Sequence, residues 1–186
     1  MGSIFSSRPA AQIAAALVLH PHTPLRKNEL VRVTGLGWPY VQRGLASLKR
    51  LGLLRVIASK GYEVYEIDPA TPYLPAIQRA ALVDCGIVEA LAPLAPRLRF
   101  VMVIGSFAWG HPTMRSDLDL LVVGGASRDE IAEALEPLEK RYERSFDPIV
   151  YSDEEMHARL GADDYLLRNA ITGGLRILGD PSLVPA

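Results

Sequence analysis

The stretch from Val101 to Val123, VMVIGSFAWGHPTMRSDLDLLVV, decides the fold of the second half of this chain. Its first apolar run ends in Gly105-Ser106, and Ser116-Asp117-Leu118-Asp119-Leu120 opens a second apolar run. We therefore predict a strand, a tight turn into a helix start, and a second strand. Residues two apart on a strand point to the same face, so Asp117 and Asp119 should present two carboxylates together.

Two neighbouring carboxylates repel each other unless a cation lies between them. Oxygen ligands favour a hard ion, so we predict that Asp117 and Asp119 bind Mg²⁺ or Mn²⁺. Gly105 allows a backbone to approach a ligand closely. Ser106 opens the predicted helix, where free N–H groups favour phosphate. A phosphate-binding turn beside a dicarboxylate metal site is the arrangement that phosphoryl or nucleotidyl transfer requires.

The same residues resemble a known signature. Gly105-Ser106, Ala108, Gly110 and the SDLDL segment at 116–120 are similar to the motif of the DNA polymerase beta-like nucleotidyltransferase superfamily, in particular of its minimal prokaryotic members. The alternative is a pair of surface aspartates that flank a loop. The resemblance implies that a nucleoside monophosphate is transferred from a nucleoside triphosphate, ATP among the options, to an acceptor hydroxyl with the help of Mg²⁺.

The resemblance also implies a third metal-binding carboxylate, which the superfamily takes from a later strand beside the D-x-D strand. Asp147 in the predicted strand 146–151 is placed for this role, although prokaryotic relatives with an attached helix-turn-helix commonly carry Asn there. Catalysis and metal binding are therefore expected at Asp117, Asp119 and Asp147. The residues expected to bind the nucleotide are Gly105, Ser106, Ser116 and, unless it is a surface salt-bridge partner, Arg115.

The first 68 residues have the pattern of a separate basic domain. Hydrophobic spacing and turn residues predict helices over 8–20, 25–34 and 38–51, and a strand hairpin over 53–67. Three helices followed by a hairpin form a winged helix-turn-helix, and the stretch resembles winged-helix regulators of the ArsR type. Residues 1–68 carry nine Lys or Arg against four Asp or Glu, a net charge of +5, whereas residues 69–186 carry −6.

A basic winged helix predicts binding to DNA. On the third predicted helix, a polar face lies opposite the apolar positions and should enter the major groove, while cations nearby reach phosphates. The alternative is an ordinary solvated face on a module that serves dimerisation or partner docking. The residues expected at the DNA are Tyr40, Gln42, Arg43, Ser47, Arg50 and Lys60.

The remaining pattern places a connecting segment at residues 69–96, with one long helix from Leu74 to Leu94, before a nucleotidyltransferase domain at 97–186. That domain is predicted to hold a mixed sheet flanked by helices, which makes the chain α/β (α+β). Further helices are expected over 128–143, 152–160 and 162–172.

The chain has no apolar run near ~18 residues and no signal peptide, and its one cysteine, Cys85, is expected in the core. These features predict a cytoplasmic protein with no membrane contact. The expected partners are a nucleoside triphosphate, DNA, and a protein acceptor or toxin, since minimal nucleotidyltransferase domains resemble antitoxins; a homodimer is a further option. The alternative function is a transcriptional regulator whose nucleotidyltransferase domain senses a nucleotide or is inactive.

Overall fold

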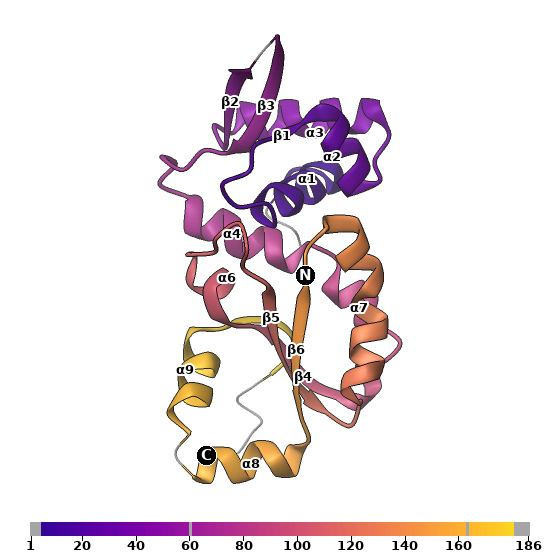
Figure 1. Cartoon of the computed structure of the whole chain (residues 1–186), viewed down its shortest axis with the longest axis vertical. Coiled ribbons are helices and arrows are strands. Elements are labelled where there is room, and N and C mark those ends of the chain that lie inside the picture. Colours follow the sequence, from indigo (N-terminus) through magenta and orange to yellow (C-terminus); the bar gives the residue numbers. More distant parts are fainter. Residues whose placement is uncertain (1–4, 60, 163, 181–186) are drawn as a thin grey trace. The chain divides into compact units, whose positions relative to one another are not determined.

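The computed structural model describes residues 5–59, 61–162 and 164–180. It confirms the predicted α/β (α+β) class, with helices packed on sheets (Figure 1). Its contacts divide the chain into two units, residues 1–85 with 140–143 and residues 86–139 with 144–186. Within the described ranges, no helix is both long enough and apolar enough to span a bilayer.

The first unit has the element order of a winged helix-turn-helix. Its strands form an antiparallel sheet in the order β1-β3-β2. Its first three helices enclose a core that includes Ile13, Leu30 and Leu48. The elements are α1 (Arg8–Val18), β1 (Leu25–Arg26), α2 (Lys27–Thr34), α3 (Trp38–Arg50), β2 (Leu54–Ser59), β3 (Tyr62–Ile67) and α4 (Leu74–Val83).

Two local predictions for the first half of the chain were wrong. Leu25 and Arg26 form a short strand paired with β3 instead of the first turn of a helix, because Arg26 is extended (φ −78°, ψ 163°) and serves as the N-cap of α2. The long helix predicted over 74–94 is broken after α4. Gly86 at the break has φ +104°, a conformation that glycine adopts at little cost, and α5 (Ile87–Leu91) begins anew after it.

The second unit is built on a mixed four-stranded sheet in the order β6-β5-β4-β7. Strand β5 pairs in parallel with β6, whereas β4 is antiparallel to both β5 and β7. After α5, its elements are the 3-10 helix η1 (Ala95–Arg97), β4 (Leu98–Val103), α6 (Gly105–Trp109), β5 (Leu118–Gly124), α7 (Arg128–Tyr142), β6 (Phe146–Tyr151), α8 (Asp153–Gly161), α9 (Tyr165–Gly173) and β7 (Leu175–Gly179).

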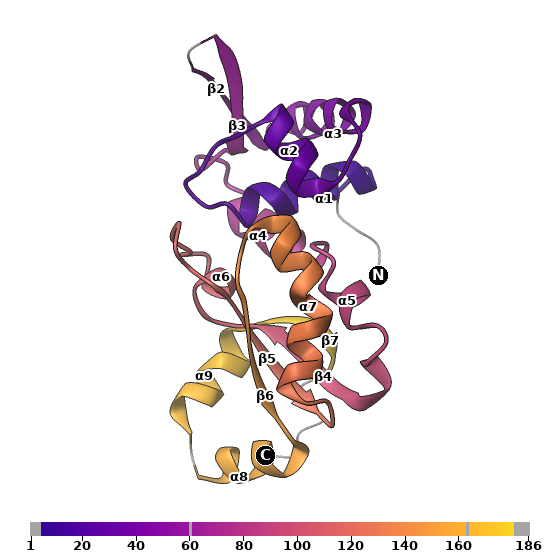
Figure 2. The same cartoon turned by 45° about the vertical axis from the view of Figure 1, so that its right-hand side comes forward.

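Both faces of β5 are covered along most of its length. Leu121 and Val123 pack with Met156 of α8 and Leu167 of α9 in one hydrophobic cluster. Figure 2 shows α7 running along the sheet, and the inward-facing side of this helix is buried. Because alternate strand residues share a face, Asp119 lies on the same face as Leu121 and Val123, just beyond the apolar cluster.

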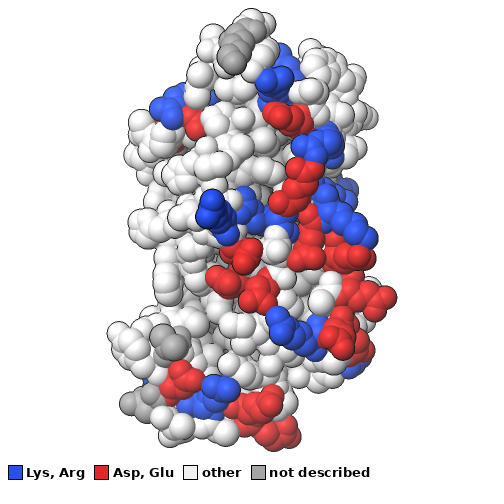
Figure 3. All heavy atoms as spheres, in the orientation of Figure 1, with Lys and Arg blue, Asp and Glu red and all other residues white. Residues whose placement is uncertain are grey.

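Two capping boxes fix the start of α7 and α8. The Ser152 hydroxyl accepts from the Glu155 N–H (3.1 Å), and the Glu155 carboxylate accepts from the Ser152 N–H (2.8 Å). At α7 the Glu130 carboxylate also binds Arg97, and this hydrogen bond is the largest cause that lowers the pKa of Glu130 to about 2. Acidic side chains gather over α7 on the surface shown in Figure 3.

Candidate active site

Three aspartates meet at one edge of the mixed sheet. Asp119 of β5 and Asp147 of β6 are direct register partners in the parallel pair. Neighbouring partners on one sheet face lie side by side, so the two carboxylates project from the same face. Asp117 immediately precedes β5, and the N–H of Leu118 that follows it donates to the Ser145 carbonyl (2.9 Å). The sheet therefore brings together the three carboxylates that the sequence singled out.

The electrostatics of these groups converge on Asp119. Burial raises the pKa of this carboxyl, and the charges of Asp147 and then Asp117 raise it further. Asp119 is half-buried, whereas the other two aspartates are exposed. A carboxylate that is partly desolvated and faces two like charges gains more than an exposed one from a bound cation.

Gly105 lies directly against this carboxylate. A Cβ atom added at Gly105 would collide with Oδ2 of Asp119, and the residue has φ +65°. The approach is fixed by the backbone, since the N–H of Ile104 donates to the Asp119 carbonyl (3.0 Å). Ser106 follows as the second residue of α6, a helix of only five residues. The sequence prediction was that Gly105 lets the backbone approach a ligand, and in the structure the group next to Gly105 is the Asp119 carboxylate.

The loop from α6 to β5 is held by its own polar groups. The Ser116 hydroxyl accepts from the Thr113 N–H (2.8 Å), so this side chain closes a local turn in addition to any role toward a nucleotide. Arg115 is exposed, and with the described residues its side chain forms no ion pair. The salt bridge considered as its alternative role is thus not seen in the described part of the chain.

Arg144 anchors the same loop, and the sequence did not reveal it. Its Nη1 donates to the carbonyls of Met114 (3.1 Å) and Ser116 (2.6 Å), and its guanidinium lies 5.8 Å from the centre of the Phe107 ring. Burial lowers the pKa of Arg144, while the negative charge of Asp117 opposes that shift. Arg144 therefore ties the segment that carries Asp117 to the start of β6. No local spacing marks this role, because its partners lie about thirty residues away in the chain.

A second arginine contacts the site from α7. Nη2 of Arg128 lies 2.9 Å from Oδ1 of Asp147, and both side chains are at least half exposed. Asp147 is thus the only one of the three aspartates in an ion pair within the described ranges. Among the described residues, no group of three or more His, Cys, Asp or Glu side chains is close enough to hold a metal as it stands. Full coordination at Asp147 would require its carboxylate to turn from Arg128 or to be shared with it.

The winged helix carries the other predicted site, on α3. Tyr40 is 50% exposed, and the Arg43 guanidinium lies 4.6 Å from the centre of its ring. Gln42 and Arg50 are also exposed, as expected for a groove-facing surface. The prediction for Ser47 was wrong, because this residue is buried and its hydroxyl bonds that of Ser6 (2.5 Å). The prediction for Lys60 lies outside the described residues.

Neither a protein-family model nor a curated protein matches this chain. Two solved structures resemble parts of it. One is a mutant of the toxin–antitoxin MntA-HpeT, with 16% identity, coverage of 53% of this chain and 74% of that chain, and a TM-score of 0.38. The other is a candidate nucleotidyltransferase from Sulfolobus solfataricus, with 20% identity, coverage of 61% and 95%, and a TM-score of 0.34. Since TM-scores below 0.5 are too low to carry a functional argument, we base the function on the geometry of the site.

Proposed function

We propose that this protein is a metal-dependent nucleotidyltransferase, which transfers a nucleoside monophosphate from a nucleoside triphosphate to an acceptor hydroxyl. The observation that carries the proposal is the arrangement around Asp119. This half-buried carboxylate faces Asp147 across a parallel strand pair and lies within the field of Asp117. The start of α6 lies directly against it. A divalent cation with its phosphate ligands fits beside Asp119, because the neighbouring ligand atoms are negatively charged carboxylate oxygens.

Each residue would have a defined task. Asp117 and Asp119 would hold Mg²⁺ or Mn²⁺, and Asp147 would complete the ligand set. When bound, the metal would polarise the phosphates and stabilise the entering and leaving oxygens. The backbone at Gly105 and Ser106 would face the triphosphate.

In the proposed reaction a bond forms between the acceptor oxygen and the α-phosphorus, and the bond from the α-phosphorus to the bridging oxygen breaks. Pyrophosphate leaves, and the proton of the acceptor hydroxyl passes to a carboxylate of the site or to water. Arg128 and Arg144 stand near this carboxylate group, so they would offset part of its negative charge.

The test is transfer of α-phosphate label from each of the four ribonucleoside triphosphates, with Mg²⁺ or Mn²⁺, to acceptors in a cell lysate. The double variant Asp117→Asn with Asp119→Asn should lower incorporation by at least about 100-fold, because each substitution removes a negative charge that would bind the metal ion. Asp129→Asn is the matched control, since Asp129 is an exposed acid in the first turn of α7. Absence of incorporation with every triphosphate and both metals, together with no thermal stabilisation by them, would refute the proposal.

A second candidate function is sequence-specific DNA binding by the winged helix, with the other unit as a nucleotide sensor. It is favoured by the exposed side chains of Tyr40, Arg43 and Arg50 on α3. Arg43→Ala with Arg50→Ala should weaken binding to the DNA upstream of the protein's own gene. The double variant should also reduce the magnitude of the slope of log K against log salt by about two. Arg141→Ala, an exposed arginine on α7, is the control. Unchanged retention of the DNA by the double variant would eliminate this candidate.

The acceptor defines the third set of tests. A protein side chain, a nucleic-acid end and a small hydroxyl compound are the chemical options for a transferase of this kind. Gel, filter and thin-layer separation of the labelled lysate distinguish them directly. A labelled protein band would identify the acceptor as a partner protein, a toxin among the options, and a band of this chain's own mass would point to self-modification within an oligomer.

A further inference from the structure

A groove runs between α3 and the β2–β3 hairpin of the first unit. It consists of two cavities of about 390 Å³ and about 250 Å³ that share Lys27 and Glu63 in their walls. This volume is that of a small-ligand site, and the groove lies on the side of α3 turned toward the hairpin. Besides the shared pair, its walls include Arg26, Asn28, Trp38 and Tyr62 in the larger cavity and Gln42, Lys49, Val56 and Tyr65 in the smaller one.

The larger cavity has an aromatic wall. Trp38 is 47% exposed, an unusual exposure for so large an apolar side chain. In the wall of the same cavity, the Arg26 guanidinium lies 3.6 Å from the centre of the Tyr62 ring and donates to its hydroxyl. An indole and a phenol ring backed by a stacked guanidinium form a surface on which planar rings stack.

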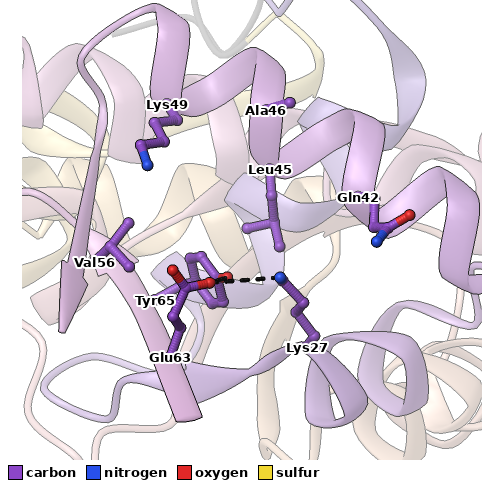
Figure 4. Close-up of a pocket in the computed structure, with 8 residues that line it drawn as sticks. All are labelled: Lys27, Gln42, Leu45, Ala46, Lys49, Val56, Glu63 and Tyr65. Carbon is purple, nitrogen blue, oxygen red and sulfur yellow. Dashed lines mark hydrogen bonds and ion pairs between the residues drawn. The ribbon is translucent and has the colours of Figure 1, made fainter. Parts of the chain in front are cut away.

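The smaller cavity supplies positive charge. Lys27 at the start of α2 and Lys49 in the last turn of α3 approach it from opposite sides (Figure 4). Glu63 lies 3.4 Å from the Lys27 ammonium and accepts from the Tyr65 hydroxyl, so this carboxylate is held by two partners. Across both cavities three cations face one carboxylate, which leaves the groove positive.

We propose that this groove binds single-stranded nucleic acid, with an unpaired base stacked at Trp38 and Tyr62 and the adjoining phosphates at Lys27 and Lys49. Aromatic platforms interleaved with cations are the chemistry by which proteins hold unpaired strands. In a duplex the faces of the bases are already stacked on one another, so a duplex cannot offer a base to this wall. The inference is independent of the metal site, and it concerns a different side of α3 from that of Arg43 and Arg50.

The test is fluorescence polarisation of the full chain with a labelled twelve-nucleotide single strand, with the blunt duplex of the same sequence, and with mononucleotides as competitors. The single strand should bind more tightly than the duplex. Trp38→Ala and Tyr62→Ala should each weaken it by about 5- to 150-fold, the range for loss of one stacked base. Trp38→Phe should retain binding within about 3-fold because it keeps a ring. Tyr73→Ala, which removes an aromatic residue that is 65% exposed outside the groove, should have no effect.

Salt dependence gives a second readout that loss of folding does not mimic. Two phosphate contacts, at Lys27 and Lys49, predict a slope of log K against log salt of about −1.4 for a single strand, and Lys49→Gln should reduce its magnitude by about 0.7. Circular dichroism melts verify that each variant is folded. The proposal is overturned if the duplex binds as well as the single strand, if the two aromatic variants bind like the wild type, or if a mononucleotide competes as well as the strand at equal nucleotide concentration.

Discussion

Replacement of Gly105 by alanine tests the arrangement around Asp119 most directly. Gly105 has φ +65°, and an added Cβ would collide with Oδ2 of Asp119. The two effects can be separated, because Gly35 has nearly the same φ, +69°, with nothing within 4 Å of the position of its Cβ. Gly35→Ala therefore measures the backbone effect alone, and Gly105→Ala measures the backbone effect and the collision.

The left-handed conformation costs an alanine about 1–2 kcal/mol, so we expect Gly35→Ala to lower the unfolding free energy by that amount. Gly105→Ala should lower it by a further ~1–2 kcal/mol, because the Asp119 carboxylate must move by about 1 Å to make room. A displacement of about 1 Å at a reacting centre reduces turnover by about 100-fold. In the double variant with Asp119→Ala the collision partner is gone, and the additional destabilisation should disappear.

The measurements are urea unfolding of the four proteins, label transfer, and thermal stabilisation by Mg²⁺ with a triphosphate. For the wild type, a ligand at one hundred times its Kd should add about 2.7 kcal/mol, and Gly105→Ala should lose most of that gain. Equal destabilisation by Gly35→Ala and Gly105→Ala, with full ligand stabilisation in both, would show that the start of α6 does not press on the Asp119 carboxylate.

Three further predictions follow from the contacts of single side chains. The folded-state pKa of Asp119 is raised, so ionisation of this carboxyl opposes folding as the pH rises through that pKa. Asp119→Asn should therefore increase the free energy of unfolding more at pH 7 than at pH 4, as measured by urea unfolding. Equal effects at the two pH values would contradict the charge repulsion. Arg144→Ala should lower the unfolding free energy by about 1.5–3 kcal/mol, since two carbonyls lose a charged donor, whereas Arg141→Ala should change it by less than about 0.5 kcal/mol. Glu63→Gln should strengthen binding of the single strand by about 2- to 5-fold in the polarisation assay, because Lys27 loses an ion-pair partner; weaker binding would show that Lys27 does not contact phosphate.

Local chemistry was sufficient to predict most elements of this fold. The strand Phe146–Tyr151 and the starts of the helices at Arg128 and Asp153 lie within one residue of the ranges predicted from the sequence. The helix predicted over 74–94 failed because its periodic apolar residues gave no sign of the left-handed turn at Gly86. Periodicity shows which residues face a core, but it does not show whether one helix or two present them.

The candidate site was predictable to the extent that sheet geometry follows from sequence. Once the runs before Gly105 and after Asp117 are strands, the two acids must lie at one edge, and a parallel third strand brings Asp147 beside Asp119. Arg128 and Arg144 could not be foreseen, since the partner of a long side chain depends on three-dimensional packing across nineteen to thirty residues. The prediction for Ser47 failed for a related reason, because the partner of its hydroxyl is Ser6, 41 residues away in the sequence.

The two proposed sites would bind phosphate in opposite ways. In the groove beside α3, cations outnumber the single carboxylate and can contact phosphate oxygens directly. At the sheet edge three aspartates would repel the same oxygens, and in the proposed site a divalent cation between them would make phosphate binding favourable. Added Mg²⁺ should consequently act in opposite directions, since it competes with the lysines for phosphate in the groove and supplies the missing charge at Asp119. The opposite effects separate the two proposals. Weaker binding of the single strand on addition of Mg²⁺ tests the groove alone, and stronger binding of the triphosphate tests the metal site alone.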